Sequence, residues 1–179
     1  MYKPRDRSGF TLIEVMIAAI VLAVAILGLM SLIPTVTQLT ETTQEGNLAL
    51  NASLQMSEAI RQYADADFVY VWKAYNGITA DDPNGAGTAP GNVFSVSGLQ
   101  NAAGSSQVGS ITFYTDENGT GNAALDAKLG MPKDLDSVAG TSADVSATYT
   151  LLPFRIAVDW KDHSGHPRHT EIFSQVASY

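Results

Sequence analysis

The sequence predicts an α+β protein in which one long N-terminal helix packs on a small antiparallel β-sheet. Three observations carry this prediction. An apolar run without charge occupies residues 15–33, a polar segment with helical spacing follows it, and the C-terminal part alternates apolar and polar residues. The length of 179 residues suits one compact domain with an appendage.

Composition excludes several classes of protein. The chain has 10 Lys and Arg against 18 Asp and Glu, a net charge of −8, and its cations are scattered, which argues against a general polyanion binder. It has no Cys, which excludes a disulfide framework, a thiol nucleophile and a Cys-ligated metal site. An oxidising compartment is not excluded, because many exported proteins contain no disulfide.

The apolar run predicts a membrane helix. At about 1.5 Å per residue, residues 15–33 nearly span a hydrocarbon core of about 30 Å, and Phe10–Ile13 complete the span. Cations among residues 1–9 precede the run and none follows it before Arg61, so the N-terminus is expected in the cytoplasm and the rest outside. A cleaved secretory signal ending at Ala25 is the alternative, but the apolar run continues beyond that point.

Glu14 is the one carboxylate near the start of this helix. A charge in hydrocarbon needs either a shallow position or a cationic partner, and no Lys or Arg of the same helix supplies one. The segment Gly9-Phe10-Thr11-Leu12-Ile13-Glu14-Val15, after a short basic leader, resembles the prepilin peptidase motif of type IV pilins and type II secretion pseudopilins.

The resemblance implies specific roles for these residues. An aspartate protease of the inner membrane, the prepilin peptidase, would cut between Gly9 and Phe10 and methylate the new amino group of Phe10. Glu14 would pair with the N-terminus of a neighbouring subunit during filament assembly, because opposite charges attract strongly in a low dielectric. The helix would melt locally between Gly28 and Pro34, and an ordinary helix with a proline kink is the alternative.

The resemblance also implies the pilin fold and its division along the chain. Residues 1–9 would be the leader, 10–34 the transmembrane and assembly helix, 35–67 an amphipathic helix, and 68–179 a β-rich extracytoplasmic head. Apolar and small residues recur at helical spacing after Pro34, which predicts a helix that continues to about Ala64 and packs on the head. These residues are Val36, Leu39, Thr43, Gly46, Leu50, Leu54, Ser57 and Ile60.

The head is expected to consist of strands and loops. Residues 68–75 are rich in aromatic and β-branched types and predict a strand or a helix–strand junction. Residues 76–92 predict a loop, 93–97 and 110–115 short strands, and 117–146 a surface excursion. The clearest hairpin joins 147–159 and 170–177 through a turn at 161–165, with Pro153 at an edge or bulge. This ending and the membrane segment are similar to PilV-type minor pilins and I-type minor pseudopilins.

A calcium site is one expectation for the head. Asp116, Asn118, Thr120 and Asp126 surround a glycine-containing turn and offer the oxygen ligands that calcium prefers. The glutamate that closes an EF-hand loop is missing, since Ala127 stands at that position. A polar turn without metal is the alternative, and no other cofactor is expected.

Other candidate chemistry is weaker. His163, His166 and His169 are expected to be exposed turn residues, with a metal site as the alternative. Tyr70, Trp72 and Tyr75 are expected to pack the end of the helix onto the sheet, with an adhesive or DNA-contacting patch as the alternative. The sequence lacks the G-x-S-x-G, P-loop and G-x-G-x-x-G patterns, so no enzymatic activity and no small-molecule ligand are expected.

The expected function is that of a minor structural subunit of a type IV pilus that primes or caps the filament. The alternatives are a minor pseudopilin of a type II secretion system, a competence pilin for DNA uptake, and a membrane-anchored exported binding or enzymatic domain. The expected partners are the prepilin peptidase, other pilin subunits and, before assembly, the bacterial inner membrane. Direct DNA binding is not favoured, because the head is acidic. The final location is the pilus, the cell surface or a periplasmic pseudopilus.

Overall fold

The computed structural model describes residues 11–76 and 88–178. Its first element is a single helix, α1 (Leu12–Asp67). The chain divides into two compact units, Met1–Glu41 and Thr42–Tyr179, so the second part of α1 belongs to the same unit as the sheet.

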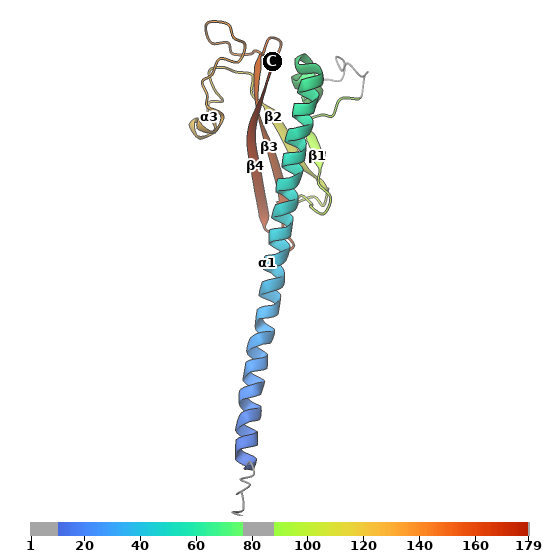
Figure 1. Ribbon diagram of the computed structural model, residues 1–179, viewed down its shortest axis with the longest axis vertical. Coiled ribbons are helices and arrows are strands. Elements are labelled where there is room, and N and C mark those ends of the chain that lie inside the picture. Colours follow the sequence, from blue (N-terminus) through green and yellow to red (C-terminus); the bar gives the residue numbers. More distant parts are fainter. Residues whose placement is uncertain (1–10, 77–87, 179) are drawn as a thin grey trace, which may run out of the picture. The chain divides into compact units, whose positions relative to one another are not determined.

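The second unit combines the part of α1 from Thr42 onwards with a four-stranded sheet, as Figure 1 shows. All neighbouring strands are antiparallel and their order is β1-β2-β3-β4. This arrangement of one long helix and an antiparallel sheet confirms the predicted α+β pilin fold. The elements after α1 are η1 (Phe68–Tyr70), α2 (Val71–Tyr75), β1 (Val93–Ser95), β2 (Gln107–Phe113), α3 (Ala123–Leu129), β3 (Leu151–Lys161) and β4 (Pro167–Ala177).

Small residues form the face of α1 that packs on the sheet. The buried positions after residue 41 are Ala49, Ser53, Ser57 and Ile60, and the Ser53 hydroxyl donates to the Ala49 carbonyl at 2.9 Å. Short side chains let a helix approach a sheet closely, whereas the long side chains of Leu50 and Leu54 lie beside this face and are 42% and 53% exposed. Of the predicted stripe, Ser57 and Ile60 are buried, whereas Val36, Leu39, Thr43, Leu50 and Leu54 are exposed.

The core lies between α1 and the inner face of the sheet. Phe154 and Ile156 of β3 are fully buried and pack in one cluster with Ile60. A second cluster surrounds Ala49 and Val158, and the Phe94 ring of β1 packs against both clusters. The short edge strand β1 thus contributes an aromatic side chain that joins the two halves of the core.

Residues 68–75 are helical, and the predicted strand is wrong. η1 and α2 continue the chain past α1, with Val71, Ala74 and Tyr75 buried. The aromatic and β-branched composition reflects burial rather than extended backbone. Trp72 is half-buried and its backbone N–H donates to the Tyr149 hydroxyl at 3.2 Å, while that hydroxyl donates to the Phe68 carbonyl at 2.7 Å. This segment therefore packs the end of the helix onto the head.

The C-terminal hairpin is present with shifted bounds, because its first strand begins at Leu151 rather than at 147 and its second begins at Pro167 rather than at 170. β3 and β4 pair over eleven positions, from Leu151 opposite Ala177 to Lys161 opposite Pro167. Pro153 lies inside the central strand β3, so the prediction of an edge or bulge is wrong. Its carbonyl accepts from Tyr114 N–H on the β2 side at 3.0 Å, just beyond the end of β2. Because Pro153 has no N–H to return this bond to Tyr114, regular pairing of β2 with β3 ends at the Phe113–Phe154 pair.

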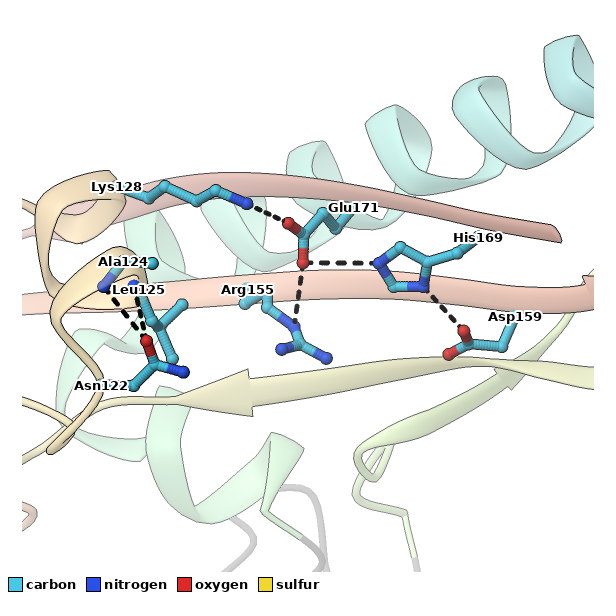
Figure 2. Close-up of polar contacts among 8 residues, drawn as sticks. All are labelled: Asn122, Ala124, Leu125, Lys128, Arg155, Asp159, His169 and Glu171. Atoms are coloured by element: carbon cyan, nitrogen blue, oxygen red, sulfur yellow. Dashed lines mark hydrogen bonds and ion pairs between the residues drawn. The ribbon is translucent and has the colours of Figure 1, made fainter.

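The excursion over residues 117–146 contains a helix that the sequence pattern does not indicate. Asn122 caps α3, because its side-chain oxygen accepts from Ala124 N–H at 3.1 Å and Leu125 N–H at 3.3 Å (Figure 2). Gly130 ends the helix with a left-handed φ of 71°. The predicted loop over 76–92 lies partly outside the described residues, and residues 88–92 have no helix or strand.

Gly109→Ala is expected to destabilise the head. A Cβ at Gly109 would lie 2.3 Å from Phe94 Cζ, and the two residues are direct partners across β1 and β2. Overpacking of this kind costs about 1–3 kcal/mol of unfolding free energy. Gly46→Ala is the matched control, because nothing lies within 4 Å of its added Cβ and alanine favours a helix by about 1 kcal/mol. Chemical denaturation of the two variants should therefore give opposite signs, and equal stability would contradict the packing of Phe94.

Candidate functional site

The N-terminal motif leads directly into α1. Gly9 and Phe10 lie outside the described residues, so cleavage and methylation at this bond stay predictions. Thr11 is the first residue that the structure describes, and Glu14 lies in the first turn of the helix.

Thr11 and Glu14 form a reciprocal cap on the start of α1. The Thr11 N–H donates to Glu14 Oε2 at 2.9 Å, and the Thr11 hydroxyl donates to the same oxygen at 2.8 Å. In return, Thr11 Oγ1 accepts from the Glu14 N–H at 3.4 Å. A Thr-x-x-Glu sequence is the signal for this capping box, and it identifies a second role for Glu14 that its charge alone does not reveal. The described residues give Glu14 Oε1 no donor, so this oxygen can accept from a cation outside the subunit.

The first unit of the structure presents an apolar surface. Every large apolar side chain from Leu12 to Ile33 is at least 45% exposed. α1 contains a segment that is long and apolar enough to cross a membrane, a criterion that considers length and composition alone. Beside Glu14, this surface holds a shallow apolar groove of about 510 Å³ lined by Glu14, Ile17, Ala18, Val21, Leu22 and Ala25.

The helix is continuous at the two positions where melting is predicted. Both Gly28 and Pro34 lie inside α1. The Ser31 hydroxyl donates to the Gly28 carbonyl at 2.8 Å, and the Thr37 hydroxyl donates to the Ile33 carbonyl at 3.0 Å. Melting between Gly28 and Pro34 concerns the assembled filament and stays a prediction.

The predicted calcium ligands pair with one another. Asp116 Oδ1 accepts from the backbone and side-chain nitrogens of Asn118 at 2.9 and 3.0 Å. Asp126 Oδ1 accepts from the Thr120 N–H and hydroxyl, each at 2.7 Å. Gly119 has a φ of 112°, and a Cβ there would lie 3.0 Å from the Asp126 carboxylate, so the turn requires glycine. These contacts order the turn and occupy oxygens that a calcium ion would need.

A buried carboxylate adjoins this turn. Glu117 is 1% exposed and its two oxygens accept from backbone N–H groups of Leu135 (2.6 Å), Asp136 (3.3 Å) and Ser142 (2.6 Å). These hydrogen bonds lower the pKa of Glu117, and the bond from Leu135 has the largest effect. Glu117, Asp134 and Asp136 place carboxylate oxygens within 4.8 Å of one another. Among the described residues, no other cluster of three or more His, Cys, Asp or Glu side chains has this spacing. The sequence alone did not single out Glu117, because it resembles an exposed loop residue.

Calcium binding by the 116–126 turn stays a prediction with a direct test. If the turn binds calcium, millimolar calcium should raise the midpoint of thermal unfolding, because a ligand that binds only the folded state stabilises the folded state. EGTA should reverse the rise, and Asp126→Asn should remove it. A calcium response that persists in Asp126→Asn, or no response in the wild-type chain, would contradict calcium binding at this turn.

The three histidines do not gather at one point. His169 lies between two carboxylates, with Nδ1 at 2.7 Å from Asp159 Oδ1 and Nε2 at 3.4 Å from Glu171 Oε2 (Figure 2). The hydrogen bond with Asp159 is the main cause that raises the pKa of His169. His166 instead faces Asp162 at 3.5 Å. His163 and His166 are exposed between β3 and β4, whereas His169 lies within β4, so the prediction of a turn residue is wrong for His169.

Asp162 holds the turn of the same hairpin. It is 7% exposed, accepts from the His166 N–H at 2.8 Å and accepts from two nitrogens of Arg168 at 2.9 and 3.0 Å. The bond from the His166 N–H is the main cause that lowers the pKa of Asp162. The turn is therefore closed by a buried, charge-paired carboxylate.

Comparison with known families finds one similarity, at the N-terminus. Residues 4–30 match the model of the prokaryotic N-terminal methylation motif. Curated proteins and solved structures give no match. The matched range contains Gly9, Phe10 and Glu14, and it ends inside the exposed apolar part of α1. The chain therefore carries the prepilin-type N-terminal methylation motif of the type IV pilin and pseudopilin family, joined to a head with the pilin fold.

Proposed function

We propose that the protein is a minor structural subunit of a type IV pilus, stored in the inner membrane and assembled through its N-terminal helix. The single observation that carries this proposal is the methylation motif over residues 4–30, which includes the start of the exposed apolar part of α1. Processing by the peptidase and assembly with other subunits follow from that motif. It also points to a structural protein rather than an enzyme.

The surface around Glu14 supports assembly through helix–helix packing. The groove beside Glu14 contains Ala18 and Ala25, whose small side chains let a second helix approach closely. Glu14 Oε2 caps its own helix and leaves Oε1 for the N-terminal ammonium group of a neighbour. The peptidase creates that ammonium group when it removes the leader, so assembly depends on processing.

Membrane anchoring is supported by the same segment. The motif and the apolar helix favour an inner-membrane precursor with its N-terminus in the cytoplasm and its head in the periplasm. After assembly the head would lie on the pilus or cell surface. The minor role is proposed from the similarity of the C-terminal hairpin to PilV-type minor pilins.

Deletion of the coding gene tests the choice of machine. If the protein is a minor pilin that primes assembly, the deletion is expected to reduce the number of surface filaments and to leave secretion of folded exoproteins unchanged. Loss of exoprotein secretion with intact pili would instead indicate a pseudopilin. Loss of DNA uptake with intact adhesion would indicate a competence pilin. Either result would contradict the proposed role in a pilus.

Gly9→Leu is expected to block removal of the leader. A peptidase that cuts after glycine must bring the scissile carbonyl close to its carboxylates, and a large side chain at that position obstructs the approach. The variant should accumulate in membranes at the mass of the full chain. Ser8→Leu, one residue earlier, is the matched control and should be processed normally. A mature-sized product from Gly9→Leu would contradict cleavage at this bond.

A further inference from the structure

The outer edge of β4 is unpaired over its whole length in the part of the chain that the structure describes. β4 is the last strand of the sheet and pairs with β3 alone. In an antiparallel ladder about half of the backbone N–H and C=O groups of an edge strand point away from its partner. Another strand can pair with such an edge unless features such as proline or charged side chains disfavour the pairing.

The two halves of β4 differ in how strongly their residues disfavour pairing with another strand. The first half contains Pro167 and charged or titratable side chains at Arg168, His169 and Glu171, which disfavour strand pairing. The second half, residues 172–177, reads Ile-Phe-Ser-Gln-Val-Ala and has no charge of its own. Proline and charged side chains therefore disfavour strand pairing at the start of β4 but not at its end.

A cationic cleft lies at the open half of the edge. It has a volume of about 440 Å³, and no carboxylate is among its lining residues, although the protein has a net charge of −8. The lining residues are Arg61, Lys128, Leu129, Pro153, Phe173, Ser174 and Gln175. Arg61 comes from α1 and Lys128 from α3, so cations stand on both sides of β4. Figure 1 shows α3 beside this strand.

The two cations of this cleft, Arg61 and Lys128, and Lys133 beside it contact mainly neutral groups. Arg61 Nη2 donates to the Ser174 hydroxyl at 3.0 Å, and Lys133 Nζ donates to Gln175 Oε1 at 2.7 Å. Lys128 forms an ion pair with Glu171 and lies 4.9 Å from the centre of the Phe173 ring (Figure 2). Of these three cations, Lys128 alone contacts Glu171, a carboxylate that also lies near Arg155 and His169, and the contacts of Arg61 and Lys133 with Ser174 and Gln175 leave positive charge at the edge.

A neighbouring cleft limits where that charge extends. It shares Arg61 and Gln175 with the first cleft but also contains Glu58 and Asp65 beside Val176 and Ala177. Acidic side chains would be attracted at Phe173–Gln175 and repelled towards the end of the strand. The charge pattern therefore specifies a position along the edge as well as the sign of the ligand.

We propose that the edge of β4 at Phe173–Gln175 binds an extended acidic segment of a partner protein by strand addition. Backbone hydrogen bonds along β4 would supply affinity, and Arg61, Lys128 and Lys133 would select glutamate or aspartate side chains. This surface lies on the head, away from the N-terminal motif in sequence, and gives the subunit a recognition site beyond its proposed assembly role.

Peptide titration of the full chain in detergent micelles tests the proposal. The probe is acetyl-Val-Glu-Val-Glu-Val-amide, and its matched control replaces both glutamates by lysine. Backbone amide resonances of residues 172–176 are expected to shift with the glutamate peptide and to stay unchanged with the lysine peptide. No shift with either peptide, equal binding of both, or shifts confined to another surface would overturn the proposal.

Two further comparisons separate charge from strand pairing. Combined Arg61→Gln and Lys128→Gln should weaken binding of the glutamate peptide at least about tenfold, whereas Lys161→Gln, an exposed cation at the far end of β3, should not. A glutamate peptide N-methylated at alternate backbone positions keeps its charge but cannot donate to β4. Undiminished binding by that peptide would overturn strand addition.

Discussion

Glu14→Val is expected to leave the protein inserted and processed but to lower its amount in sheared filaments at least about tenfold. The substitution removes the carboxylate whose Oε1 faces no donor among the described residues, and valine keeps the segment apolar. A neighbouring N-terminal ammonium group would then enter the low-dielectric helix bundle without a counter-charge, which is the costly outcome.

Immunoblots of filaments and membranes from the same cells give the measurement. Glu41→Val is the matched control, because it makes the same change in the same helix beyond the apolar run. Thr11→Val retains the carboxylate but removes the hydroxyl that donates to it at 2.8 Å, and should have a smaller effect. Normal incorporation of Glu14→Val would contradict the role of this carboxylate in assembly.

Glu117→Gln is expected to produce the largest loss of head stability among charge-neutralising changes. Both carboxylate oxygens accept backbone N–H bonds, from Leu135 and Asp136 on one side and Ser142 on the other. A carboxamide has one acceptor oxygen and one NH₂ group. In Glu117→Gln the NH₂ group would therefore face backbone N–H groups, which are donors too, and the hydrogen bonds on that side would be lost. The loop from 131 to 145 would lose an anchor, and the midpoint of thermal unfolding should fall by at least about 4 °C.

The pH dependence of the same variant provides a second measurement. The folded pKa of Glu117 is lowered, so its contribution is fully present above the unfolded pKa of about 4.3 and is lost as the pH falls through the lower folded pKa. The wild-type chain should therefore lose more stability than Glu117→Gln on acidification through this range. Glu58→Gln, an exposed helix position, is the control. Equal midpoints for Glu117→Gln and Glu58→Gln would contradict the anchoring role.

Strong local patterns explain what the sequence predicts correctly. The apolar run and the glycine-to-glutamate spacing of the motif are complete within residues 9–33 and need no tertiary information. The C-terminal hairpin is also local, because alternation and a glycine-containing turn define it. The spacing of apolar and small residues beyond Pro34 correctly predicts a helix. It does not predict that Ala49 and Ser53 form the buried face, because their burial depends on how closely the sheet packs against the helix.

Tertiary context explains the remainder. Residues 68–75 have the composition of a strand but bury their aromatic side chains as a continuation of the helix. α3 is only seven residues long and lies among glycines and small polar residues, so its periodicity is too short to read. Glu117 is indistinguishable in sequence from an exposed acid, because its backbone donors come from residues 18 to 25 positions later.

Mass spectrometry of the N-terminal peptide from native membranes or sheared filaments tests the central claim most directly. A peptide that begins at N-methylated Phe10 is the predicted result, and it requires both cleavage after Gly9 and the methylation that the motif over residues 4–30 indicates. An intact leader, or a peptide that begins near Ile26, would contradict the assignment to pilin-type processing.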